Sequence, residues 1–120
     1  MDQEAPMTIQ GMTAGSKNEY NLAQAFDKLK MPYEYQYDIL GGRSRRGGYV
    51  LDFVLLETAP GPTAINIQGS YWHKENANEA FERITIKRWC EEKGWDYLEV
   101  GEPETENLEA AIKLAKELNG

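Results

Sequence analysis

The spacing of hydrophobic and polar positions predicts helices and strands in a defined order along the chain. Between residues 17 and 30 apolar side chains recur at helical spacing, and Ser16 followed by Glu19 three residues later forms a capping-box pattern. Residues 33–40 alternate aromatic and polar side chains, which is typical of a half-buried strand. The remaining patterns predict strands at 49–57, 63–72 and 95–100 and helices at 76–92 and 105–118.

This order, α-β-β-β-α-β-α, places the chain in the α/β class. Short turns between the first three strands predict an antiparallel meander, and the helix before the fourth strand predicts a parallel addition. We therefore expect a mixed four-stranded sheet with a C-terminal helix, in a single domain that spans residues 16–120. Residues 1–15 show no period, and we expect a flexible or loosely docked N-terminal tail there.

The composition limits the compartments and partners that the protein can have. A hydrophobic share of 41% and a charged share of 28% are typical of a globular domain. The net charge of −7 argues against coating nucleic acid through bulk electrostatics, but it is compatible with DNA contact through a local basic patch. Cys90 is the single cysteine, which excludes an internal disulfide and a cysteine-based structural zinc site. No stretch approaches the ~20 apolar residues of a membrane span and the start lacks a signal-peptide pattern, so we expect a cytoplasmic protein without membrane contact.

Polar residues that interrupt apolar strands are the first candidates for chemistry. Asp52 lies inside the apolar run 49–57, where a lone buried carboxylate is costly. Asn66 and Gln68 lie two apart in the next strand and therefore share a face. Antiparallel pairing across the intervening turn would bring these groups together, and oxygen ligands of this kind suit Mg²⁺. The alternative is an aspartate at a solvent-facing strand edge beside ordinary exposed amides.

A glycine-flanked loop at 41–48 carries Arg43, Arg45 and Arg46 and no acidic residue. Such a loop would form a local basic patch that suits contacts with DNA phosphates. An arginine-rich surface turn without a ligand is the alternative interpretation.

Two neighbouring strands carry a resemblance to a known superfamily. The run 47–55, with an Asp-Phe pair at Asp52, and the run 65–73 after a short turn resemble the PD-(D/E)XK nucleases. The segment QGSYWH at 68–73 is most similar to the branch that contains the very short patch repair endonucleases. The α-β-β-β-α-β order extends the resemblance over most of the chain. It implies a restriction endonuclease-like core and a metal-dependent nuclease.

The resemblance also implies roles for individual residues. It places the metal-binding aspartate at Asp52 and the E-x-K positions at Asn66 and Gln68, where the acid and the lysine are missing. In the short-patch-repair branch a main-chain carbonyl serves as a ligand, and the matching oxygen here belongs to Ile67. His73 matches that branch's histidine after the tryptophan, which implies that it activates or orients the attacking water. The implied catalytic set is therefore Asp52, Asn66, Gln68 and His73.

Three further residues have both a functional and a structural interpretation. Glu19 lies where many relatives place an accessory carboxylate for the metal, and the capping box explains it equally. Tyr71 and Trp72 could stack on a nucleic-acid base, or they could be core and rim aromatics. Without the resemblance, His73 would be a strand-end residue packed on these aromatics.

Together these expectations describe a Mg²⁺- or Mn²⁺-dependent endodeoxyribonuclease without structural zinc, encoded by a bacterium or a phage. The chain leaves no room for a separate recognition domain, so specificity is expected to be modest or supplied by a homodimer or a protein partner. One alternative keeps the fold and loses catalysis, giving a domain that binds nucleic acid or serves in phage assembly. Another is a protein-interaction domain in which the arginine loop is incidental.

Overall fold

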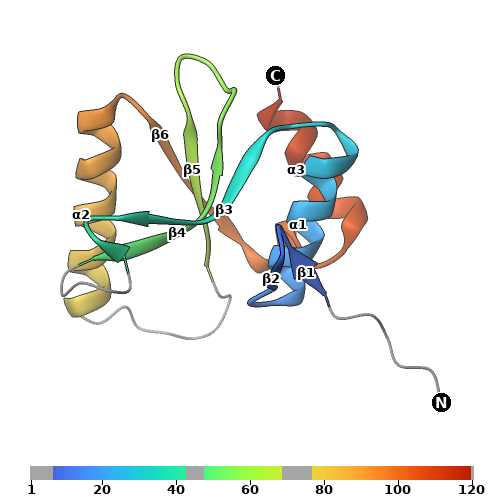
Figure 1. Ribbon diagram of the computed structural model, residues 1–120, viewed down its shortest axis with the longest axis horizontal. Coiled ribbons are helices and arrows are strands. Elements are labelled where there is room, and N and C mark those ends of the chain that lie inside the picture. The colour runs from blue at the N-terminus through green and yellow to red at the C-terminus, as the bar shows by residue number, and fades with distance from the viewer. Residues whose placement is uncertain (1–6, 43–47, 69–76, 120) are drawn as a thin grey trace.

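A four-stranded sheet with helices on both faces forms the body of the molecule (Figure 1). The computed structural model describes residues 7–42, 48–68 and 77–119. The elements in chain order are β1 (Thr8–Ile9), β2 (Met12–Thr13), α1 (Lys17–Lys28), β3 (Tyr33–Ile39), β4 (Tyr49–Leu55), β5 (Thr63–Gln68), α2 (Ala77–Lys93), β6 (Asp96–Gly101), the 3₁₀ turn η2 (Glu102–Glu104) and α3 (Leu108–Leu118). None of the helices within these described ranges is both long and apolar enough to cross a membrane.

The sheet has the strand order β3-β4-β5-β6. β3 pairs antiparallel with β4, β4 pairs antiparallel with β5, and β5 pairs parallel with β6. The α/β class, the antiparallel meander and the parallel fourth strand that the sequence predicts are therefore confirmed.

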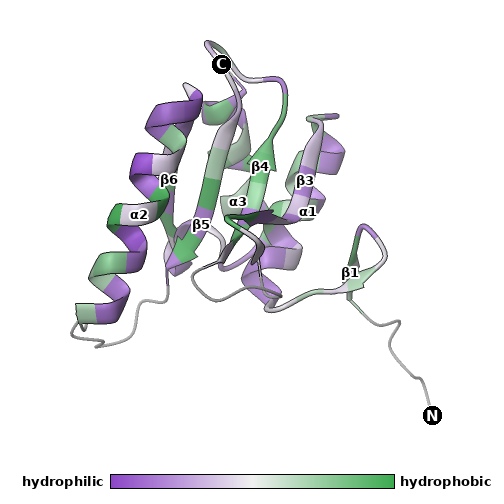
Figure 2. Ribbon diagram, turned by 60° about the vertical axis from the view of Figure 1, so that its left-hand side comes forward, coloured by the Kyte–Doolittle hydropathy of each residue, from purple (hydrophilic) through white to green (hydrophobic). Residues whose placement is uncertain are grey.

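Two apolar cores lie on the two faces of the sheet. The first, which we call the α1-side core, packs α1 and α3 against residues such as Tyr35, Phe53 and Ile65. The second, the α2-side core, packs α2 against residues such as Leu51 and Val54. Figure 2 shows that β4 is largely hydrophobic, as expected for a central strand that is covered on both faces, whereas hydrophobic and hydrophilic positions both occur along β5.

Ser16 caps the N-terminus of α1, which is one half of the predicted capping box. Ser16 has extended backbone angles, and its hydroxyl accepts a hydrogen bond of 3.1 Å from the N–H of Glu19. α1 ends at Lys28, and Lys30 follows in the left-handed region with φ of 54°. The predicted helix start directly after Ser16 is therefore confirmed.

The segment before α1 differs from the predicted tail. Residues 8–13 form a two-stranded antiparallel hairpin, and Ile9 is 1% exposed within the α1-side core. The Gln10 side chain donates to the carbonyl of Tyr33 at 2.7 Å and accepts from the N–H of Tyr35 at 2.8 Å. This amide thus pairs one C=O and one N–H on the free edge of β3, a contact that a sequence without regular spacing does not reveal.

A break in the alternation of β3 and β4 places side chains two residues apart on opposite faces of the sheet. Gln36 has φ of 56°, and the ladder pairs Tyr35 with Phe53 and then Tyr37 with Leu51. Tyr35 and Phe53 belong to the α1-side core, whereas Tyr37 and Leu51 belong to the α2-side core. In a regular strand residues two apart share a face. Asp52 lies in β4 at the point where this regularity is lost.

Candidate functional site

Strands β4 and β5 separate at Asp52. Their ladder pairs Leu55 with Thr63, Val54 with Ala64 and Phe53 with Ile65. Beyond Phe53 and Ile65, two hydrogen bonds that involve side chains take the place of the backbone hydrogen bonds between the strands. The N–H of Asp52 donates to Oδ1 of Asn66 at 2.8 Å, and the N–H of Ile67 donates to Oδ2 of Asp52 at 2.8 Å. The Asp52 carboxylate is therefore fixed in the fork between the two strands.

Burial makes the charge on Asp52 unfavourable. Desolvation raises the pKa of Asp52 from its ordinary value of 3.8 to about 6, and the negative charge of Glu19 adds to this increase. The hydrogen bond from the Ile67 N–H acts in the opposite direction, because it stabilises the carboxylate form. A nearby cation would relieve both the desolvation and the repulsion between the two acids.

Glu19 and Asp52 line the same open hollow, which has a volume of about 690 Å³. The hollow is bounded by residues 12–15, which begin in strand β2 of the N-terminal hairpin, and by parts of β3 and β4. Apart from Glu19 and Asp52, the lining residues carry no charge. The two carboxylates come from α1 and β4, which the sequence separates by 33 positions between residues 19 and 52. The structure thus places Glu19 and Asp52, which the resemblance names together as metal ligands, on one surface.

Two hydroxyl groups hold the carboxylate of Glu19. The Tyr35 hydroxyl donates to Oε1 at 2.6 Å, and the Ser16 hydroxyl donates to Oε2 at 2.9 Å. Sequence reasoning did not identify Tyr35, because it is one of several tyrosines in an alternating strand and nothing local marks its hydroxyl. The contact arises only when β3 packs against α1.

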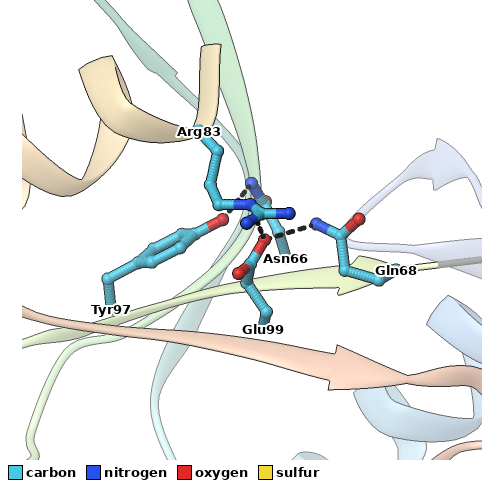
Figure 3. Close-up of polar contacts among 5 residues, drawn as sticks. All are labelled: Asn66, Gln68, Arg83, Tyr97 and Glu99. Atoms are coloured by element: carbon cyan, nitrogen blue, oxygen red, sulfur yellow. Dashed lines mark hydrogen bonds and ion pairs between the residues drawn. The ribbon is translucent and has the colours of Figure 1, made fainter. Parts of the chain in front are cut away.

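The side chains of Asn66 and Gln68 point to the other face of the sheet (Figure 3). The Asn66 amide nitrogen donates to the hydroxyl of Tyr97 at 3.2 Å, and the Gln68 amide nitrogen donates to Oε2 of Glu99 at 2.8 Å. Glu99 also lies 3.3 Å from Nε of Arg83, a residue of α2. Asn66 thus contacts the main chain of Asp52 but not its carboxylate.

The sequence predicts that the Asp52 carboxylate and the side-chain amides of Asn66 and Gln68 form one cluster, and this prediction is wrong. The two amides lie on the α2 side of the sheet, whereas the carboxylate lies on the α1 side. Residues two apart in β5 do share a face, as the sequence analysis assumed, but Ile65 and Ile67 are the pair that packs on the α1 side. The irregular course of β4 at Asp52 places its carboxylate on the side of Glu19 instead. The alternation of side chains within a single strand could not reveal the position of the Asp52 carboxylate, because β4 and β5 separate at Asp52.

Ile67 lies beside Asp52, as the sequence analysis expected for a main-chain ligand. Its N–H reaches Oδ2 of Asp52, and in an extended strand the N–H and C=O of one residue point to the same edge. The Ile67 carbonyl is thereby directed to the edge of β5 that borders the fork. The six remaining predicted site residues lie outside the described residues: Arg43, Arg45, Arg46, Tyr71, Trp72 and His73.

The donor set suits a hard cation. Mg²⁺ usually keeps several waters and binds proteins through one or two carboxylates. Asp52 and Glu19 would supply these carboxylates, and the Ile67 carbonyl would supply a neutral oxygen. Within residues 7–42, 48–68 and 77–119 no group of three or more His, Cys, Asp or Glu side chains is placed to hold a metal ion. Among the residues that the structure describes, a cation in the hollow would therefore depend on the two acids, backbone oxygen and water.

Comparison with protein-family models, with curated proteins and with solved structures finds no match for this chain. The functional interpretation therefore depends on the geometry of the site and on the chemistry of its residues.

Proposed function

We propose that the protein is a metal-dependent endonuclease that hydrolyses phosphodiester bonds in DNA, built on a restriction endonuclease-like core. The observation that supports this most is the position of Asp52 in the fork between β4 and β5, beside Ile67 and on the same hollow as Glu19. The antiparallel-antiparallel-parallel sheet with helices on both faces is compatible with the core that the sequence resemblance implies.

The charges of the hollow favour a cation as part of the site. Both charged side chains that line it are acids, and a DNA phosphate is itself negative. A phosphate could approach Asp52 and Glu19 only if a positive charge lay between them. A divalent ion bound there would neutralise charge on the phosphate and lower the pKa of a bound water.

Asn66 and Gln68 occupy the positions where the E-x-K motif has an acid and a lysine. Their substitution for those residues removes no ligand from the proposed cation site. Both side chains are engaged on the α2 side, with Tyr97 and Glu99 respectively. In the proposed site Asn66 instead fixes the backbone of Asp52, while Asp52, Glu19 and the Ile67 carbonyl face the cation. The departure from the usual E-x-K pattern is therefore compatible with a nuclease of the short-patch-repair type.

A second candidate function keeps the cation site without cleavage. No lysine, arginine or histidine is among the residues that line the hollow in the described part of the chain. Proton transfer from the attacking water would then fall to His73, the one histidine of the sequence. If His73 does not reach the hollow, the domain would bind DNA through the cation and leave it intact.

The test is cleavage of supercoiled plasmid in Mg²⁺ or Mn²⁺ by the wild-type chain and by Asp52→Asn and Glu19→Gln. Asp96→Asn is the matched control, because it makes the same chemical change at an exposed position at the start of β6. Even partners of metal ligands cost 10–100-fold when they are changed, so loss of Asp52 should reduce cleavage by about 100-fold or more.

Cleavage that persists in Asp52→Asn would exclude this site. DNA binding that requires Mn²⁺ and Asp52, without cleavage by the wild-type chain, would favour the second candidate. His73→Ala distinguishes the two further, because only the nuclease proposal gives the imidazole a role in the reaction rate.

A further inference from the structure

The Glu19 carboxylate accepts a hydrogen bond from Tyr35 that plays no part in capping helix α1. The cap of α1 is already made by the Glu19 N–H, which donates to the Ser16 hydroxyl oxygen at 3.1 Å. Tyr35 approaches from β3, and its hydroxyl donates to Oε1 of Glu19 at 2.6 Å while accepting the Gly15 N–H at 3.0 Å. A tertiary contact of this kind adds nothing to helix capping, so it calls for another explanation.

The Tyr35 hydroxyl is itself fixed in place. The residue is 3% exposed, and its ring lies 5.2 Å from the ring of Phe53, centroid to centroid, in the α1-side core. The hydroxyl is therefore held where it donates to Glu19.

Space around Glu19 is also restricted. A Cβ atom on Gly15 would lie 2.8 Å from Oε2 of Glu19, so the absence of a side chain at residue 15 lets the carboxylate occupy its position. Without these constraints, the like charge of Asp52 would favour rotation of the flexible Glu19 side chain toward solvent. The surroundings thus hold two mutually repelling acids on one hollow.

We propose that Tyr35 is a positioning residue, which holds Glu19 in the orientation needed to act with Asp52 as a ligand of a divalent cation. This inference rests on the proposed function. Carboxylates that bind metals are commonly oriented by hydrogen bonds from a second layer of residues, and loss of such a partner costs 10–100-fold in metal affinity.

The experiment is a double-mutant cycle on the full chain, with Mn²⁺ affinity measured by isothermal titration calorimetry. The variants are Tyr35→Phe, Glu19→Gln and the two combined. Tyr37→Phe is the matched control, because this tyrosine lies in the same strand but packs on Trp95 in the α2-side core. Thermal unfolding of each variant reports whether the fold is retained, and phenylalanine preserves the ring packing of either tyrosine.

We expect Tyr35→Phe to weaken Mn²⁺ binding about tenfold and Tyr37→Phe to leave it unchanged. In the Glu19→Gln background the Tyr35 substitution should have no further effect, because its role passes through Glu19. Unchanged affinity in Tyr35→Phe, or an equal loss in both backgrounds, would overturn the inference.

Asp52→Asn separates failure of the inference from failure of the proposed function. If Asp52→Asn abolishes Mn²⁺ binding and the cycle shows no coupling, the cation site stands and only the role of Tyr35 is wrong. If Asp52→Asn leaves Mn²⁺ affinity unchanged, the proposed site falls and the role of Tyr35 falls with it.

Discussion

Replacing Asp52 with asparagine should make the protein more stable at neutral pH in the absence of divalent cations. The substitution removes the charge that burial disfavours and keeps an oxygen that can accept the Ile67 N–H, which now donates to Oδ2 at 2.8 Å. Groups that bind ligands are often retained at a cost in stability. The proposed cation site therefore predicts a gain in stability together with a loss of ligand binding.

The size of the effect follows from the pKa of Asp52. Its increase from 3.8 to about 6 corresponds to about 3 kcal/mol, since a tenfold change in proton affinity is worth ~1.36 kcal/mol. The folded state binds this proton more tightly than the unfolded state. The penalty is thus absent well below pH 3.8, grows as pH rises toward 6 and is complete above that value.

The assay is urea unfolding in EDTA at pH 8 and at pH 4.5, for wild type, Asp52→Asn and the exposed control Asp96→Asn. We expect the free energy of unfolding of Asp52→Asn to exceed that of wild type by about 3 kcal/mol at pH 8 and by about 1 kcal/mol at pH 4.5. Adding Mn²⁺ should then stabilise the wild type and not Asp52→Asn, because a ligand stabilises only the state that binds it.

The reasoning would be refuted by an Asp52→Asn protein that is no more stable than wild type at pH 8. A gain of the same size at both pH values would also contradict it, because the effect would then not come from the charge. A gain of equal size in Asp96→Asn would mean that the net charge of the protein, rather than the fork between β4 and β5, is responsible.

Three further predictions concern the surroundings of the site. Gly15→Ala should weaken Mn²⁺ binding in calorimetry with little change in melting temperature, because its Cβ would displace the flexible end of Glu19; unchanged affinity would contradict this. Phe53→Ala should lower the free energy of unfolding in urea by about 3–5 kcal/mol, since Phe53 is 0% exposed and packs against three aromatic rings. A decrease below ~1 kcal/mol would show that neighbouring side chains fill the cavity. Gln68→Ala should leave Mn²⁺ affinity unchanged, because its amide is bonded to Glu99 on the α2 side, and a clear loss would return Gln68 to the cation site.

Asp52 could be singled out from the sequence because it conflicts with its local pattern. Asp52 stands in an apolar strand, where only a partner or a ligand compensates for a buried charge. Only the resemblance implies a main-chain ligand at Ile67, and the structure places its N–H 2.8 Å from Oδ2 of Asp52. The contribution of Tyr35 could not be predicted, since a hydroxyl's partner depends on how a strand and a helix pack.

The sequence by itself determined the order of the α-helices and sheet strands from α1 onward and the directions of the sheet strands, but not the N-terminal hairpin. These features depend on local periodicity, on capping residues such as Ser16 and on the lengths of the connections between elements. Only the tertiary structure decided which groups meet at the site. Gln36 with φ of 56° and the side-chain bonds at Asp52 break the regular alternation, so the carboxylate faces Glu19 while Asn66 and Gln68 face α2. Such breaks are set by contacts between strands and helices distant along the chain, which a pattern within one strand cannot encode.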